Sequence, residues 1–356
     1  VNNFCQVFGT TQLSRLDLPD LSDELPKIKI EPDEIASIIF TSGTAADPKG
    51  AMLSHGNFIS NVLAVATVLE PYETDQMLSV LPMYHALEFT SGFLMSIYGG
   101  TTVTYLNSPT AMLEIMRETQ TTVMVAVPRF FQMLYNTIMR HLTKSANLAI
   151  NSTPLNVKFD ADIIQKAHQA MGGKIRVFVS GGASLPNTVY DNFNRLGITI
   201  HQGYGLTESA PVLAVTPYKK SRRSSVGFAV DGTKVEIKNA NFDGIGEIVA
   251  KGPSVMRGYY KNPEATERAI INDYLHTGDL GCFDDDGYLY ITGRSKEVIV
   301  TSAGKNVYPT EIEALYCQNE MIDELCAVGI SLTDAISEEV HVVIKPQENN
   351  ELAQEA

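Results

Sequence analysis

The sequence predicts an α/β fold: a doubly wound, mainly parallel sheet, followed by a β-rich subdomain and a small α+β C-terminal domain. Three observations carry this prediction. Short β-branched runs alternate with amphipathic stretches as far as about residue 202, which is typical of a parallel sheet with helices on both faces. From Pro211 on, strand-like runs are separated by Gly- and Asp-rich turns. From Gly293 on, the order becomes strand, helix, strand, strand.

In the first region the periodicity of apolar residues predicts strands and helices in alternation. The strand-like runs are residues 37–40, 77–80, 101–105, 122–127, 176–180 and 197–201. The helix-like segments are residues 57–69, 87–98, 111–118, 128–141, 161–171 and 187–196. Ligands on such a sheet bind at the carboxyl ends of its strands, so the loops that follow the strands are where a site is expected.

The second and third regions lack the alternation of strands and helices. Strands are expected at residues 234–238, 247–250 and 288–292, with turns at 241–246 and 284–287. After them come a strand at 297–300, a helix at 309–318 and strands at 325–330 and 338–345. A chain of 356 residues is too long for one small core. The predicted division is a linker or N-terminal remnant at 1–31, an α/β subdomain at 32–212, a β-rich subdomain at 213–292 and a truncated C-terminal domain at 293–356.

Composition excludes several classes of function. The formal net charge of −14 argues against a general nucleic-acid binder, and the basic cluster at 219–223 is read as a solvated loop. No apolar run approaches the roughly 18 residues that a membrane helix needs, so any membrane contact would be peripheral. The cysteines have neither paired C-x-x-C spacing nor a nearby His, which predicts no zinc site, no disulfide scaffold and a reducing, cytoplasmic setting. They are Cys5, Cys282, Cys317 and Cys326.

A first cluster of small polar residues follows the expected strand 37–40. It reads Thr41-Ser42-Gly43-Thr44-Ala45-Ala46-Asp47-Pro48-Lys49. Hydroxyls and backbone N–H groups can converge there on one anion, and Lys49 adds a positive charge, so the pattern favours phosphate binding. The Walker A pattern does not fit, because Pro48 precedes the Lys and no Ser or Thr follows it. A solvated loop explains such a cluster about equally well.

Two further clusters also follow predicted strands. One reads Gly203-Tyr204-Gly205-Leu206-Thr207-Glu208. Its ring can stack on a base, its hydroxyl can reach a phosphate, and its carboxylate can hold a cation such as Mg²⁺. The other reads Ser180-Gly181-Gly182-Ala183 and exposes backbone that a flat ring can approach closely. An ordinary tight turn explains either cluster taken alone.

The fourth cluster is His276-Thr277-Gly278-Asp279-Leu280. The Asp279 carboxylate can accept two hydrogen bonds from a ribose, as acidic residues do in dinucleotide sites. It can equally well form an Asx-turn.

In this order, the four clusters resemble the adenylate-forming superfamily, which includes acyl-CoA synthetases, adenylation domains of peptide synthetases, and luciferases. The resemblance runs from Pro32 to about Lys345 and includes the further motifs Leu81-Pro82-Met-Tyr-His85, Lys251-Gly-Pro-Ser-Val-Met-Arg-Gly-Tyr-Tyr260, Thr292-Gly-Arg294-Ser-Lys296 and Gly304-Lys305-Asn-Val-Tyr-Pro309. The stretches 127–135, 179–186 and 252–260 are most similar to long-chain fatty acyl-CoA synthetases.

The resemblance implies an AMP-forming acid–thiol ligase that uses ATP, Mg²⁺ and CoA. A fatty acid carboxylate would attack the α-phosphate of ATP, pyrophosphate would leave, and the thiol of CoA would then cleave the acyl-AMP. Catalysis would rest on positioning and charge stabilisation and would need no enzyme nucleophile. The expected location is cytoplasmic, with peripheral contact at the inner membrane face as the one membrane association left open.

The resemblance also implies which residues bind the nucleotide. Some of them lie in the α/β subdomain at 32–212, and others follow it. The leaving phosphates would be bound by Thr41, Ser42, Gly43, Thr44 and Lys49. The adenine would be enclosed by Gly181, Gly182, Ala183, Gly203 and Tyr204. Asp279 and Arg294 would hold the ribose.

The expected catalytic group is Lys49, His85, Thr207 and Glu208, with Glu208 as the metal ligand. His85 would lie near the acyl pocket, although a capping or core histidine is the alternative. The C-terminal domain would swing about a hinge at 293–297 that contains Lys296, and Gly304 would lie on the thiol side. The alternative for Lys296 is a solvated charge in a linker, and the alternative for Gly304 is an ordinary turn residue.

The chain departs from the family pattern in two ways. Ala45 and Ala46 stand where the family has Thr or Ser followed by Gly, which removes a phosphate-binding hydroxyl and fills a flexible backbone position. No counterpart of the family's adenylation lysine follows Lys305, and the family's first N-terminal subdomain is missing. These departures predict a fragment that is weak or inactive in adenylation by itself.

Three alternatives stay open. A fatty acyl-AMP ligase would transfer its adenylate to an acyl carrier protein rather than to CoA. A non-catalytic homologue would bind nucleotide or acyl ligand without turnover. A generic nucleotide-binding α/β protein would have no acyl substrate. The apolar residues Phe89, Phe93, Leu94 and Met95 could line an acyl tunnel, but such a helix face more often belongs to the core.

Overall fold

The computed structural model describes residues 29–41, 48–146, 159–218, 220–301, 306–316, 319, 321–330 and 338–346. The chain divides into two units, Val1–Glu31 and Pro32–Ala356. All helices and strands named below belong to the second unit.

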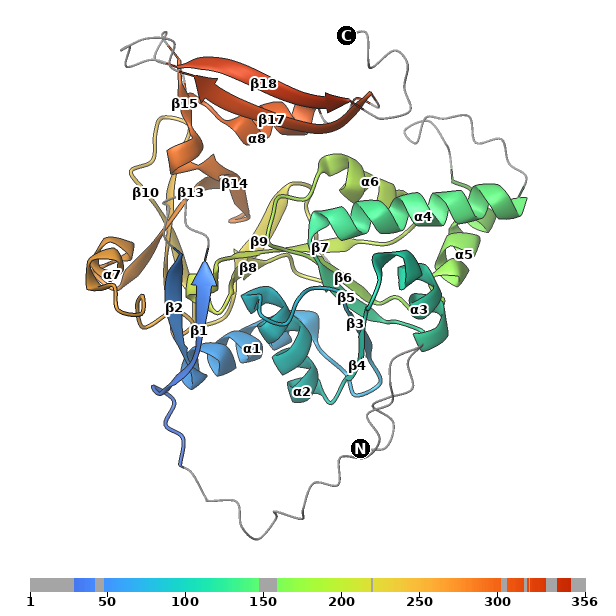
Figure 1. Cartoon of the computed structure of the whole chain (residues 1–356), viewed down its shortest axis with the longest axis horizontal. Coiled ribbons are helices and arrows are strands. Elements are labelled where there is room, and N and C mark those ends of the chain that lie inside the picture. Colours follow the sequence, from blue (N-terminus) through green and yellow to red (C-terminus); the bar gives the residue numbers. More distant parts are fainter. Residues whose placement is uncertain are drawn as a thin grey trace. The chain divides into compact units, whose positions relative to one another are not determined.

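Five parallel strands form the part of the sheet that the βα alternation predicts (Figure 1). Their order across the sheet is β4–β3–β5–β6–β7. The strands are β3 (Gln76–Ser79), β4 (Thr102–Tyr105), β5 (Val123–Ala126), β6 (Val177–Ser180) and β7 (Ile200–Gly205). The helices around them are α1 (His55–Leu69), a π-helix η1 (Glu88–Leu94), α2 (Met95–Gly99), η2 (Pro109–Ala111), α3 (Met112–Thr119), α4 (Pro128–Ala146), α5 (Ala161–Ala170) and α6 (Asn187–Arg195).

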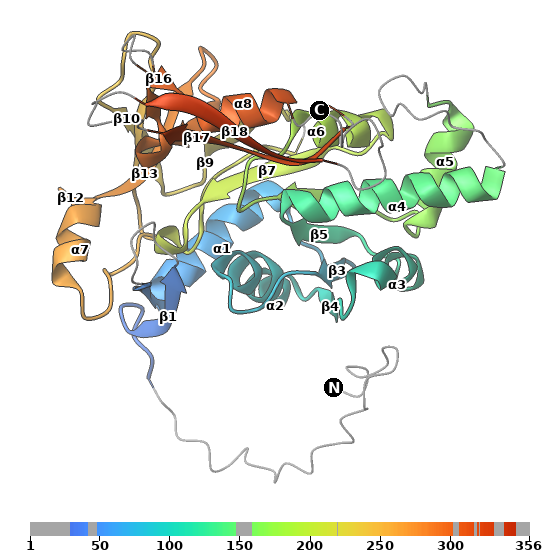
Figure 2. The same cartoon turned by 45° about the horizontal axis from the view of Figure 1, so that its top comes forward.

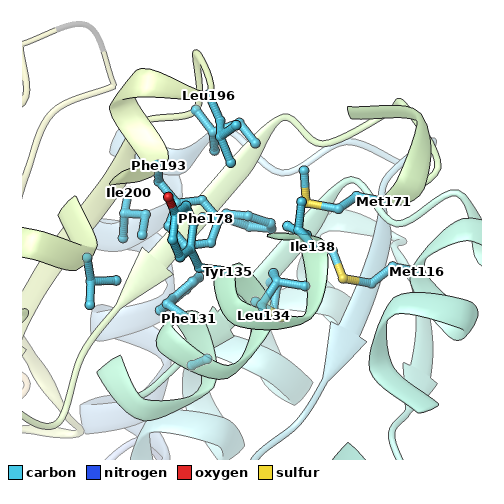
Figure 3. Packing of buried hydrophobic residues seen from close by; sticks show 14 of the residues in the cluster. Met116, Phe131, Leu134, Tyr135, Ile138, Met171, Phe178, Phe193, Leu196 and Ile200 are labelled. Carbon is cyan, nitrogen blue, oxygen red and sulfur yellow. The ribbon is translucent and has the colours of Figure 1, made fainter. Parts of the chain in front are cut away.

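The two faces of these strands are buried in two different cores, because successive side chains of a strand point to opposite faces. Leu78 and Met124 belong to the core that α3, α4, α5 and α6 cover, whereas Met77 and Val125 belong to the core that α1 and α2 cover. Figure 1 and Figure 2 both show α4 next to α5, which it contacts. Figure 3 shows the interior of the first core, where Phe131, Phe178 and Phe193 are in aromatic contact. The doubly wound fold is confirmed.

The β-rich region continues the same sheet through antiparallel pairs. From β7 the order is β8–β9–β14–β13–β11–β10, and β12 pairs with β13. The elements are η3 (Thr207–Ser209), β8 (Val212–Val215), β9 (Ser225–Ala229), β10 (Lys234–Lys238), β11 (Gly246–Lys251), α7 (Pro263–Ala269), β12 (Ile270–Ile271), β13 (Tyr274–Phe283) and β14 (Leu289–Arg294). The sheet therefore runs without a break from the nucleotide motifs at β7 to those at β13 and β14.

The first strand differs from the prediction. β1 (Ile35–Thr41) pairs with β2 (Lys49–Ser54), which the sequence did not predict, in a separate antiparallel hairpin. Thr41 opposes Lys49 in its register, so β1 is followed in the sheet by an antiparallel partner strand. The helix α1 starts one strand later, where Ser54 is its N-cap and forms a capping box with Asn57.

The C-terminal region has the predicted order of strand, helix, strand, strand, with one additional short strand. Its elements are η4 (Ser295–Glu297), β15 (Ile299–Val300), β16 (Asn306–Val307), α8 (Pro309–Tyr316), β17 (Ile322–Ile330) and β18 (Glu339–Pro346). The strands β17 and β18 are antiparallel, and α8 packs against β17. The domain boundaries near residues 212 and 292 stay predictions.

Among the described residues, no helix is both long and apolar enough to span a bilayer.

Candidate active site

A cleft of about 1120 Å³ lies at the carboxyl ends of β6 and β7. One wall comes from the turn after β6 and from α6, and the other comes from β13 and β14. Side chains of α8 also line it. Of the residues predicted to bind nucleotide, the cleft is lined by Gly182, Ala183, Gly203, Tyr204, Asp279 and Arg294. The cleft thus brings three of the four sequence clusters to one place.

Tyr204, Asp279 and Arg294 form a connected group on the wall of the cleft. The Tyr204 hydroxyl donates a hydrogen bond to Oδ2 of Asp279 at 2.8 Å, and Nε of Arg294 lies 3.0 Å from Oδ1. Asp279 and Arg294 face each other in the antiparallel register of β13 and β14. Burial raises the pKa of Asp279 even though Tyr204 and Arg294 favour its ionised form. Burial also raises the pKa of Tyr204, and the neighbouring Asp279 adds to this, so the tyrosine is a proton donor in this pair.

The turn after β6 presents backbone to the cleft. Gly182 has φ of +78°, which is a left-handed conformation that glycine adopts without strain. Gly182 and Ala183 are exposed, whereas Gly181 is buried and donates its N–H to the Ala126 carbonyl. The predicted approach of a flat ring therefore concerns Gly182 and Ala183 more than Gly181.

Three buried polar side chains on the cleft wall were not predicted from the sequence. Ser180, Asn192 and Gln202 line the cleft and are at most 6% exposed. Each has a buried polar atom without a hydrogen-bond partner among the described residues, namely Ser180 Oγ, Asn192 Oδ1 and Gln202 Nε2. Buried polar groups are normally paired, so these atoms are suited to a polar ligand. Ser180 begins the predicted cluster 180–183 and Gln202 directly precedes the cluster 203–208, which is the signal that could have found them.

The segment between β8 and β9 links the two walls of the cleft. Arg223 pairs with Asp191 of α6 at 2.7 Å, and Ser221 shares a hydrogen bond with Tyr190 of α6. On the opposite side, Arg222 pairs with two aspartates of the turn before β14, Asp284 at 2.6 Å and Asp286 at 2.5 Å. The basic cluster that was read as a solvated loop is therefore partly engaged in ion pairs.

Glu208 and Lys49 lie outside the cleft lining and are connected through a third residue, Tyr259. The Tyr259 hydroxyl donates to Oε1 of Glu208 at 2.7 Å, and Nζ of Lys49 lies 5.2 Å from the centre of its ring. Glu208 is near enough to Asp279 to contribute to the raised pKa of that residue. Thr207 directly precedes Glu208 in η3, and both are partly exposed.

No group of three or more His, Cys, Asp or Glu side chains in the described part of the chain could hold a metal ion. In nucleotide sites Mg²⁺ is usually bound by one or two carboxylates together with substrate phosphates and waters. The half-buried Glu208 carboxylate is the residue here that could contribute to such a site.

The remaining predicted residues are placed as follows. Thr41 ends β1, and its hydroxyl lies 3.4 Å from the Lys49 carbonyl. His85 is exposed in the bend before η1, with its ring 4.8 Å from that of Tyr84. Lys296 is exposed in η4. The residues Ser42, Gly43, Thr44, Ala45, Ala46 and Gly304 lie outside the described residues.

Of the residues proposed to line an acyl tunnel, some are buried in the core and others are partly exposed. Met95 is 6% exposed and belongs to the core under α1 and α2, so for this residue the core explanation holds. Phe89 packs edge-on against Phe58 at 5.1 Å and lies 5.9 Å from Phe93.

A comparison with protein families identifies this arrangement. Residues 7–260 match the family described as AMP-binding enzyme, and this match includes the first three nucleotide clusters. The chain belongs to the AMP-binding enzyme family. The predicted resemblance is confirmed at this level, and the motifs at Asp279 and Arg294 follow the matched segment.

This AMP-binding enzyme is also similar to individual proteins. A long-chain-fatty-acid–CoA ligase of Mycobacterium bovis, FadD15, is 31% identical over 320 residues, which are 83% of this chain and 52% of the relative. Long-chain-fatty-acid–CoA ligase 1 of Homo sapiens is 29% identical over 354 residues, which are 92% of this chain and 51% of the relative. The chain spans about half the length of the curated relatives it matches.

Solved structures support the same fold. The crystal structure of ATP-bound MatB from Rhodopseudomonas palustris matches with a TM-score of 0.75 and 28% identity, over 91% of this chain and 60% of the other. An o-succinylbenzoate CoA synthetase (MenE) from Bacillus subtilis matches with a TM-score of 0.74, and at 23% identity it is evidence for the fold alone.

Proposed function

We propose that this AMP-binding enzyme activates a fatty acid carboxylate with ATP to form acyl-AMP and then transfers the acyl group to CoA. The observation that carries the proposal is that the connected group of Tyr204, Asp279 and Arg294 lines the same cleft as the exposed Gly182–Ala183 backbone. The relatives named long-chain-fatty-acid–CoA ligases favour a fatty acid among carboxylate substrates.

The buried carboxylate of Asp279 suits the ribose. Its two oxygens already accept from Tyr204 and contact Arg294. A carboxylate has about four lone-pair sites, so each oxygen keeps capacity for one further hydrogen bond from a ribose hydroxyl. Arg294 also favours the charged form of Asp279, which burial opposes, and hydrogen bonds to a charged acceptor are stronger than neutral ones.

The phosphates would lie toward Lys49, Thr207 and Glu208. Lys49 provides a positive charge for the leaving pyrophosphate, and the Thr207 hydroxyl is a donor for the α-phosphate. Glu208 would hold Mg²⁺, which when bound neutralises charge on the phosphates. The Gly182–Ala183 backbone and the Tyr204 ring would enclose the adenine. In this scheme the protein positions the reactants and stabilises charge.

Product analysis tests the proposal. The chain is incubated with ATP, Mg²⁺ and palmitate, with and without CoA, and products are identified by mass spectrometry. Palmitoyl-CoA supports the proposal, whereas palmitoyl-AMP that accumulates in the presence of CoA supports the carrier-protein alternative. Neither product, together with no fatty-acid-dependent rise in melting temperature, would contradict an acyl-activating function.

A non-catalytic homologue is the second candidate, and the Ala45–Ala46 pair is the observation that favours it. The double variant A45T/A46G restores the hydroxyl and the flexible glycine of the family pattern. A large gain in acyl-AMP formation by this variant would support the non-catalytic candidate. In the full-length protein, acyl-AMP formation by the wild type that is already as fast as that by the variant would exclude it.

A further inference from the structure

The motif Met256-Arg257-Gly258-Tyr259-Tyr260 lies between the two charged parts of the site and has no role in the scheme above. We call residues 256–260 the strap. It runs along β2, where the Met52 N–H donates to the Gly258 carbonyl at 2.9 Å and the Tyr260 N–H donates to the Gly50 carbonyl at 2.7 Å. At its beginning, the Met256 N–H donates to the Glu208 carbonyl at 2.8 Å. The strap thus connects the strand that begins at Lys49 to the turn that carries Glu208.

Tyr259 makes this connection with its side chain as well. Its hydroxyl donates to Oε1 of Glu208 at 2.7 Å, and the ammonium group of Lys49 lies 5.2 Å from the centre of its ring. The side chain is 9% exposed and packs in a core with Ala51 and Leu53 of β2. One rigid ring therefore contacts both a carboxylate and an ammonium group that come from distant parts of the sequence.

We propose that Tyr259 is a positioning residue that sets the distance between the cation-binding Glu208 and the phosphate-binding Lys49. This inference rests on the proposed function, because it assumes that both residues serve the same Mg²⁺-bound nucleotide. In this proposal, the strap fixes the positions of the Glu208 carboxylate and the Lys49 ammonium group before the nucleotide binds.

The two contacts of Tyr259 have different consequences. The hydrogen bond restricts the Glu208 side chain to one orientation and leaves the carboxylate with acceptor capacity for a cation. The ring face attracts the Lys49 ammonium through its quadrupole, which keeps that long, flexible side chain from spreading into solvent. Removing the hydroxyl alone should therefore affect the cation, while removing the ring should also affect the phosphates.

Three variants separate these consequences. Tyr259→Phe removes only the hydroxyl, and Tyr259→Leu removes hydroxyl and ring. Tyr260→Phe is the matched control, because Tyr260 is adjacent but 44% exposed. For each protein, the melting temperature is measured without ligand, with ATP in EDTA, and with ATP over a range of Mg²⁺ concentrations.

We expect Tyr259→Phe to require about tenfold more Mg²⁺ for half of the maximal stabilisation, as the loss of one hydrogen bond to a charged group implies. Its response to ATP in EDTA should stay within about twofold of the wild type, because the ring over Lys49 is retained. Tyr259→Leu should weaken both responses, and Tyr260→Phe should match the wild type. A wild-type Mg²⁺ requirement in Tyr259→Phe would overturn the inference.

A purely structural role of Tyr259 gives a different pattern. Tyr259→Phe would then lower the melting temperature without ligand and weaken the responses to ATP equally with and without Mg²⁺, and this result also overturns the inference. Failure of the proposed nucleotide site is distinguishable, because the wild type itself would then show no stabilisation by ATP under either condition, and failure of fatty acid activation is detected separately by the product analysis above.

Discussion

At the scale of single residues, Glu88 has the least usual environment outside the cleft. It is 1% exposed in the π-helix η1, and neither carboxyl oxygen has a hydrogen-bond partner among the described residues. Its carboxyl occupies the space beside Gly92, where a Cβ would lie 2.2 Å from Oε1. Burial raises the pKa of Glu88 to about 7, although Ser79 and the Leu81 backbone oppose this. The side chain is thus largely protonated in the folded chain below neutral pH.

The raised pKa of Glu88 predicts a specific dependence of stability on pH. Between pH 4.5 and about 7, the folded chain holds a proton that the unfolded chain releases. The free energy of unfolding should therefore fall as the pH rises through this window, by about 3 kcal/mol in total. Glu88→Gln should remove this contribution in urea unfolding followed by circular dichroism. The exposed Glu118→Gln is the control, and an unchanged pH slope in Glu88→Gln would refute the prediction.

At the scale of elements, the junction between β7 and β8 depends on Gly205. A Cβ there would lie 1.9 Å from the Pro211 carbonyl oxygen, which accepts a hydrogen bond from the Leu206 N–H. At Gly203, two residues earlier on the same strand, the nearest atom to an added Cβ is 3.9 Å away. The two glycines of one motif therefore have different structural requirements.

This difference predicts that an alanine substitution destabilises the chain at Gly205 and has little effect at Gly203. Gly205→Ala should lower the free energy of unfolding by about 1–3 kcal/mol, the usual cost of overpacking, because backbone atoms would have to move apart. Gly203→Ala should change it by less than about 1 kcal/mol, since the space is free and a β conformation is retained. Urea unfolding curves of both variants check this. Equal destabilisation by the two substitutions would show that the β7–β8 junction is not the tight contact.

Most helices and strands of the parallel sheet could be predicted from the sequence, and two other elements could not. Regular periodicity predicted α1, α4, α5 and α6 and the parallel strands within a few residues. It failed at β13 (Tyr274–Phe283), because His276–Asp279 has the composition of a turn and Gly278 has φ of +72° within the strand. It also failed for the π-helix η1, which lies inside an expected α-helix. Apolar periodicity does not distinguish the two, and the burial of the Glu88 carboxyl is a feature of the tertiary structure.

Residues that line the cleft could be predicted where they belong to a local motif, and their roles in binding stay predictions. Tyr204 and Asp279 were assigned to one nucleotide, but their hydrogen bond joins positions 75 residues apart, and only the fold brings them together. Tyr259 appeared in the sequence only as part of a motif without a role. Asn192 gave no signal, because a single Asn in a helix is ordinary and its buried, unpartnered oxygen is visible only in the folded structure.

At the scale of the whole molecule, the site is assembled from segments that the continuous sheet holds together. The walls of the cleft come from β6, β7 and α6 on one side and from β13 and β14 on the other. The sheet joins them through β8 and β9, and the ion pairs of Arg222 and Arg223 join them a second time. This double connection holds the two walls of the cleft together.

The central claim is that this cleft binds an adenine nucleotide through Asp279. Isothermal titration calorimetry with AMP is the measurement, at alkaline pH because burial raises the pKa of Asp279. The wild type should bind AMP at a single site, Asp279→Asn should bind about 10- to 100-fold more weakly because hydrogen bonds to a charged acceptor are lost, and the exposed Asp285→Asn should match the wild type. No binding by the wild type, or equal affinity in Asp279→Asn, would contradict the account.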